Sequence, residues 1–70
     1  MCIIIHIHDE GDHYMVNANK LYPKGNEQPQ VAKAGAVDLR VAIRAVHSKL
    51  NDLYGKDRAV VVSHCYYAKL

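Results

Sequence analysis

The sequence predicts a small α+β domain: a small antiparallel sheet of three to four strands with one long helix packed on one face. Residues 2–8 and 14–19 alternate between apolar and polar positions, as strands with one buried face do. Residues 39–53 repeat apolar positions at spacings of three and four, as an amphipathic helix does. Residues 58–69 are rich in β-branched and aromatic side chains, which favours a last strand. The predicted element order is β-β-(β)-α-β.

The first two predicted strands separate their side chains into two sets. One set, which we expect to face the helix, consists of Ile3, Ile5, Ile7, Tyr14, Val16 and Ala18. The other set, which we expect on an open sheet face, consists of Ile4, His6, His8, His13, Met15 and Asn17. A two-residue turn at Glu10–Gly11 would place His8 opposite His13 and each apolar residue opposite another. The pattern therefore predicts a hairpin in that register.

Both prolines of the chain lie in residues 22–29, which reads as a loop. A short third strand at 30–34 follows this break, and Gly35 favours that interpretation. The alternative is that Pro29 opens the helix directly as a first-turn proline.

The helix is predicted from one apolar stripe and from its ends. The stripe consists of Leu39, Ile43, Val46, Leu50 and Leu53. We expect Asp38 in the first turn of the helix, where an acidic residue is favourable, and Gly55 lies where a C-terminal cap belongs. Because the chain has no Phe or Trp, tyrosines must help to fill the core, and we expect Tyr14 and Tyr54 there.

Length and composition exclude several classes of protein. Seventy residues form a single domain, 1–70, and its net charge of +2 excludes an acidic nucleic-acid mimic. No apolar run is long enough for a transmembrane helix, and "MCIII" lacks the basic region of a signal peptide. We therefore expect a cytoplasmic protein, in which Cys2 and Cys65 are free thiols.

Three histidines of the hairpin suggest a metal site. Directly opposed side chains on paired strands have Cβ atoms about 5 Å apart, so His8 and His13 could share a Zn²⁺ or another divalent ion, with His6 beside them. The alternative is that these histidines are ordinary polar residues on a solvated strand face.

The predicted helix also carries a polar stripe, formed by Arg40, Arg44, His47 and Asn51. Such a stripe can contact phosphates or an acidic protein surface. The alternative is a solvated helix face, since Asp38 and Asp52 dilute its positive charge. At the end of the chain Tyr66 and Tyr67 are adjacent, so one of them must point outward, and tyrosine is a preferred anchor at interfaces.

No nucleophile, base and orienting group can be identified from their spacing, so we expect no enzyme and no catalytic residues. In size and element order the chain resembles the small sheet-plus-helix inhibitors that phages and mobile elements encode, including some anti-CRISPR proteins. It also resembles the partial ribonuclease-H-like domain of HicB-type antitoxins. The first resemblance implies a protein-binding inhibitor or adaptor, acting in a host cell on a partner such as a nucleoprotein complex.

The residues expected to contact that partner are His6, His8, His13, Met15, Arg40, Arg44, His47, Tyr66 and Tyr67. Two other functions remain open at this point. One is a small protein, or a metal-linked homodimer, that binds a divalent ion through its histidines. The other is weak nucleic-acid binding.

Overall fold

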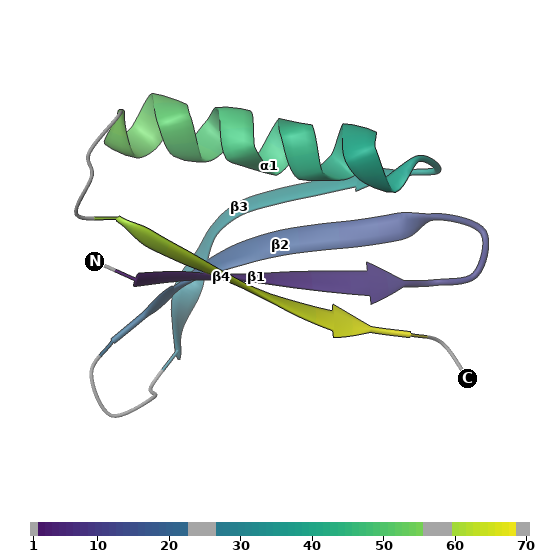
Figure 1. Cartoon of the computed structure of the whole chain (residues 1–70), viewed down its shortest axis with the longest axis horizontal. Coiled ribbons are helices and arrows are strands. Elements are labelled where there is room, and N and C mark those ends of the chain that lie inside the picture. Colours follow the sequence, from purple (N-terminus) through teal and green to yellow (C-terminus); the bar gives the residue numbers. More distant parts are fainter. Residues whose placement is uncertain (1, 23–26, 56–59, 69–70) are drawn as a thin grey trace.

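A computed structural model describes residues 2–22, 27–55 and 60–68 of the chain. It contains four strands and one helix in the predicted order (Figure 1). The elements are β1 (Cys2–Asp9), β2 (Tyr14–Leu21), β3 (Glu27–Ala36), α1 (Leu39–Tyr54) and β4 (Val61–Tyr67). The helix lies along one face of the sheet, which confirms the predicted small α+β fold.

The sheet is mixed, with the strand order β3-β2-β1-β4. Strands β1, β2 and β3 form an antiparallel meander, whereas β4 runs parallel to β1. This last pairing follows from the chain path. Because β3 runs parallel to β1, a single helix after β3 returns the chain so that β4 starts in the same direction at the other edge. The sequence predicts an antiparallel sheet, whereas the sheet is mixed because β4 pairs with β1 in parallel.

The first hairpin has the predicted faces but not the predicted register. Its turn is centred on Gly11–Asp12, where the Glu10 N–H donates to the His13 carbonyl at 3.0 Å. Gly11 has a φ of 96°, which glycine adopts without steric strain. The prediction had centred the turn one residue earlier. That shift moves the pairing by two residues, so His8 lies opposite Met15 and the predicted His8–His13 pair is wrong.

The structure contains the predicted third strand, and the alternative, a helix that starts at Pro29, is wrong. The strand is longer at both ends than the predicted range 30–34. Two irregularities interrupt its register with β2, and Pro29 falls within the second of them. The last strand is shorter than predicted, at Val61–Tyr67. Residues 58, 59 and 69 of that prediction lie outside the described residues.

Helix α1 is capped at both ends: Gly55 caps the C-terminal end as predicted, whereas Asp38, predicted within the first turn, is the N-cap. The Asp38 carboxylate accepts from the Arg40 N–H at 2.9 Å as the N-cap, and Gly55 ends the helix with a φ of 64°. With 16 residues and an amphipathic pattern, this helix falls short of what spanning a membrane requires, and it is the sole helix of the described residues.

The core lies between the helix and β1, β2 and β3. It consists of Ile3, Ile5, Ile7, Val16, Ala18, Ala32, Ala42, Val46 and Leu50. Tyr14 and Tyr54, predicted in the core, are partly buried and pack against it. Leu53 is a correction to the predicted stripe: it is 51% exposed, and Ala42 lies in the core instead. Helical residues advance by about 100° each, so Leu53 lies about 20° around the helix from the buried Val46. Its exposure therefore goes with its place in the last turn of α1, not with the face that it occupies.

Candidate functional site

The sheet face opposite the helix includes three consecutive cross-strand rows, which the registers of β4, β1, β2 and β3 define, beyond a terminal row that contains Val61 and Cys2. The first row is Ser63, Ile4, Asn19 and Gln30. The second row is Cys65, His6, Asn17 and Lys33. The third row is Tyr67, His8, Met15 and Gly35. We call these three rows the open face.

Tyr67 organises one side of the open face by contacting two histidines. Its ring stacks on that of His8, with centroids 4.7 Å apart and planes 10° from parallel. Its hydroxyl is hydrogen-bonded to Nδ1 of His6 at 3.1 Å. These contacts hold three partly exposed rings in one arrangement before any ligand arrives. A preordered aromatic surface loses less side-chain entropy when it binds a partner.

Met15 extends this row toward β3 because Gly35 leaves room for it. A Cβ atom at Gly35 would lie 2.7 Å from the Met15 sulfur, which is closer than side chains tolerate. The Met15 side chain thus lies over the backbone of β3. Methionine has three rotatable bonds and a polarisable sulfur, which suits it to adaptable contacts with a partner.

The open face is nearly uncharged. Lys33 is the one Lys, Arg, Asp or Glu residue in the three rows. Asn17 donates from Nδ2 to the Asn19 side-chain oxygen at 3.2 Å, so these two amides are also ordered. Depletion of charge combined with aromatic residues and methionine is typical of the core of a protein–protein interface.

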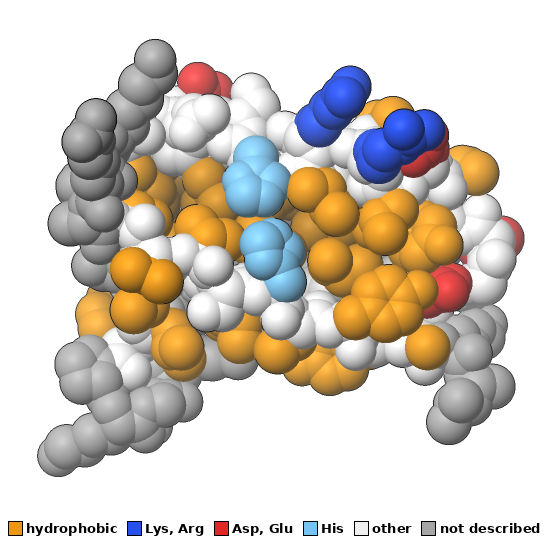
Figure 2. Space-filling model, viewed as in Figure 1, with side chains coloured by type: hydrophobic (Ala, Val, Ile, Leu, Met, Phe, Trp, Pro, Cys, Tyr) orange, Lys and Arg blue, Asp and Glu red, His pale blue; other side chains and the backbone are white. Residues whose placement is uncertain are grey.

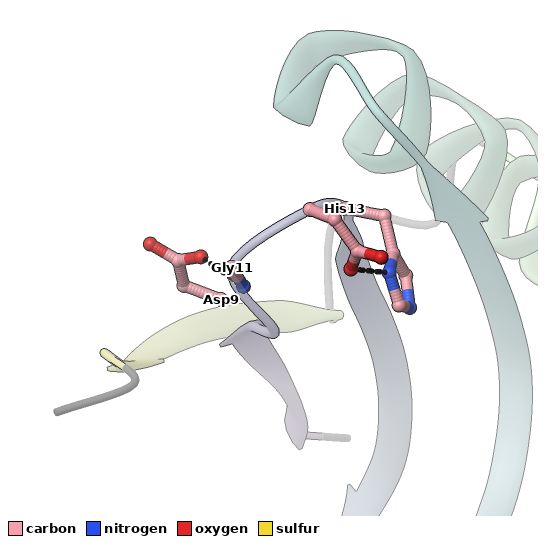
Figure 3. Close-up of polar contacts among 4 residues, drawn as sticks. Asp9, Gly11 and His13 are labelled. Atoms are coloured by element: carbon pink, nitrogen blue, oxygen red, sulfur yellow. Dashed lines mark hydrogen bonds and ion pairs between the residues drawn. The ribbon is translucent and has the colours of Figure 1, made fainter.

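His13 does not belong to the open face, contrary to the prediction. It lies in the hairpin turn, where its Nδ1 contacts the Asp12 carboxylate at 2.5 Å (Figure 3). The hydrogen bond with His13, a backbone hydrogen bond and the charge of His13 together lower the pKa of Asp12 below 3.8. The Asp9 carboxylate accepts from the Gly11 N–H at 2.9 Å, which ties the start of the same turn.

The predicted metal ligands are not brought together. The rings of His6 and His8 have centroids 6.3 Å apart, and His13 is held in the turn by Asp12. Within the described residues, no three His, Cys, Asp or Glu side chains are grouped so that they could hold a metal ion. Cys2 and Cys65 are free thiols, as predicted, since their strand partners are Val61 and His6.

The other predicted contact residues lie on the helix side of the sheet, away from the open face. Arg40 is exposed at the helix start, with its Nε 3.9 Å from the Asp38 carboxylate, and Arg44 is exposed one turn later. His47 packs beside His64 of β4, with ring centroids 5.9 Å apart. The predicted contact residues therefore belong to at least two surfaces.

Tyr66 lies on the helix side of β4, opposite to Tyr67. Its hydroxyl donates to the Asp9 carboxylate at 3.2 Å. Partial desolvation and the negative charge of Asp9 raise the pKa of Tyr66 above 10.0.

Sequence reasoning found His6, His8, Met15 and Tyr67 individually, but it missed what joins them. The pairing of β4 with β1 puts Tyr67 beside His8, and the absence of a side chain at Gly35 leaves room for that of Met15. The alternation of Ser63, Cys65 and Tyr67 was visible in the sequence. The neighbour of β4 in the sheet was not.

Comparison of the chain with protein-family models, with curated proteins and with solved structures gives no match.

Proposed function

We propose that this chain is a small protein-binding module, a stoichiometric inhibitor or adaptor, that engages its partner through the open face. The observation that carries the proposal is the ordered cluster of Tyr67, His8 and His6 on a sheet face with almost no charge. Aromatic residues that are already packed serve as anchors in protein interfaces. The partner class we propose is a protein surface in a host complex, as for the phage-type inhibitors that the chain resembles in size and element order.

The helix side is the less suitable surface for this role. Arg40 and Arg44 are long, exposed side chains, and ordering them on binding opposes association. Salt also screens their charges. On the open face, Tyr67 is already ordered by its contacts with His8 and His6, so it loses less side-chain entropy on binding.

Capture of partners by three immobilised versions of the chain tests the proposal. Proteins retained at micromolar concentration are compared for the wild type, for Tyr67→Ala and for the matched helix-side control Arg44→Ala. We expect a partner that the wild type and Arg44→Ala retain equally and that Tyr67→Ala loses by about tenfold or more, as interface anchors do.

Two results would overturn the proposal. One is a monodisperse chain that retains nothing at micromolar concentration. The other is a partner that Arg44→Ala loses and Tyr67→Ala keeps, which would assign binding to the helix side. Circular dichroism of each variant establishes that the loss does not come from unfolding.

A further inference from the structure

The two edges of the sheet are protected to very different degrees. Strand β3, at one edge, contains Pro29, two register irregularities and the exposed Lys33. Proline, bulges and lysine are the features by which natural edge strands avoid pairing with other chains. Strand β4, at the other edge, reads VVSHCYY over seven residues and contains no proline, glycine, lysine, arginine or acid. β4 is therefore the less protected of the two edges.

The surface around β4 is apolar as well. Figure 2 views the molecule with β4 in front, and hydrophobic side chains and two histidines occupy the middle of this view. The Lys and Arg side chains that it shows lie at the helix. Val61 and Tyr66 of β4 are each more than half exposed. Such a patch, flanking an unprotected strand, is typical of an interaction site.

We propose that β4 pairs antiparallel with β4 of a second copy of this chain, in the register that places His64 opposite the second copy's His64. In this register Val62 lies opposite the second copy's Tyr66, and Val61 lies opposite the second copy's Tyr67. Pairs of aromatic and β-branched residues are among the favourable cross-strand contacts. The strand is thus complementary to itself, and with no fixed charge it brings no like charges together. That self-complementarity identifies the occupant as a second copy.

The faces of the sheet are consistent with this pairing. Because His64 pairs with itself, every residue lies opposite one from the same side of the sheet: Val62 and Tyr66 on the helix side, Val61 and Tyr67 on the side opposite the helix. Helix α1 packs mainly on β3 and β2 and contacts β4 through His47 beside His64, while Tyr66 on the same side of β4 stays more than half exposed. The two four-stranded sheets then form one continuous sheet, and their open faces become a single surface.

Sedimentation of the purified chain at tens of micromolar tests the pairing. We expect a mass of about twice 7.9 kDa for the wild type. The substitution His64→Lys places two like charges directly opposite each other, which raises the dissociation constant about fivefold or more. Ser48→Lys is the matched control, because it adds the same charge at an exposed position on the outer side of the helix. It should leave the dimer largely intact.

A disulfide trap tests the register even if His64→Lys folds poorly. In a Cys2→Ser, Cys65→Ser background, His64→Cys should form a disulfide-linked dimer on oxidation, because directly opposed Cβ atoms lie about 5 Å apart. Ser63→Cys in the same background should not, because Ser63 lies opposite position 65 and its own copy is about 7–8 Å away. A monomeric wild type, or cross-linking at position 63 instead of 64, would overturn the inference. Neither result depends on capture of a partner, so it leaves the proposed function to its own test.

Discussion

His8 of β1 and Tyr67 of β4 stack with their ring centroids 4.7 Å apart and their planes within 10° of parallel, although 59 positions separate them in the chain. They meet because β4 runs parallel to β1 in the register that pairs these two residues. The contact joins the first and last strands of the fold. It also supplies the ordered aromatic part of the open face, so stability and the proposed binding function share it.

The stacked pair should show measurable coupling. In a double-mutant cycle of His8→Ala and Tyr67→Ala, measured by urea unfolding, we expect a coupling energy of about 0.5–1.5 kcal/mol, as for aromatic pairs. Tyr66→Ala serves as the control, because Tyr66 is on the other side of the same strand. Its effect should add to that of His8→Ala within about 0.5 kcal/mol. Equal coupling of His8 to both tyrosines would contradict the geometry.

Gly35→Ala should displace Met15 without unfolding the chain. The added Cβ lies 2.7 Å from the Met15 sulfur, and the end of a methionine side chain can rotate away. We expect the free energy of unfolding to change by less than about 1 kcal/mol, since the unfolded chain also loses freedom. The chemical shift of the Met15 methyl group, measured by NMR, should change. In a Met15→Ala background, Gly35→Ala meets no methionine side chain and so has no clash to relieve. If Gly35→Ala in the wild-type background leaves the Met15 methyl resonance unchanged, the contact is contradicted.

Asp12 should titrate below its ordinary value because of His13. The hydrogen bond with His13 lowers the pKa of Asp12, so the folded chain holds this proton less tightly than the unfolded chain. The interaction therefore stabilises the fold above pH 3.8, and that contribution is lost as the pH falls through the folded pKa. NMR titration of the Asp12 carboxyl checks this.

The variants His13→Ala and His64→Ala separate this cause from a general change in the fold. In His13→Ala the pKa of Asp12 should rise toward 3.8. In His64→Ala, which alters a histidine on β4, it should stay where the wild type has it. An Asp12 pKa that is the same in all three proteins would refute the assignment.

Two leucines of the helix should differ sharply in their contribution to stability. Leu50 is 6% exposed and Leu53 is 51% exposed. Leu50→Ala removes buried side-chain volume and should lower the free energy of unfolding by about 2–4 kcal/mol. Leu53→Ala should lower it by less than about 1 kcal/mol. Urea unfolding of the two variants compares them directly, and similar losses would place the buried stripe of the helix where the sequence alone had put it.

The elements, and the face on which most side chains lie, could be predicted from local patterns in the sequence. Alternation with a period of two assigned Ile5 and Val16 to the core and His6 and Met15 to the open side, and the structure agrees. A hydrophobic pattern of that period has one limitation. Moving the hairpin turn by one residue shifts the pairing by two, which changes every partner and preserves both faces. The pattern therefore could not distinguish His13 from Met15 as the partner of His8.

Which distant elements become neighbours could not be predicted in this way, because it depends on how the whole chain folds. The parallel pairing of β4 with β1 brings Tyr67 to His8, and the backbone of β3 at Gly35 makes room for Met15. These contacts depend on the order of the strands, which arises from the path of the helix crossover. Local periodicity carries no information about that path, because it records which face a residue occupies and not which strand lies beside it. The residues of the candidate site could therefore be predicted from the sequence. Their arrangement relative to one another could not, because it arises from the fold.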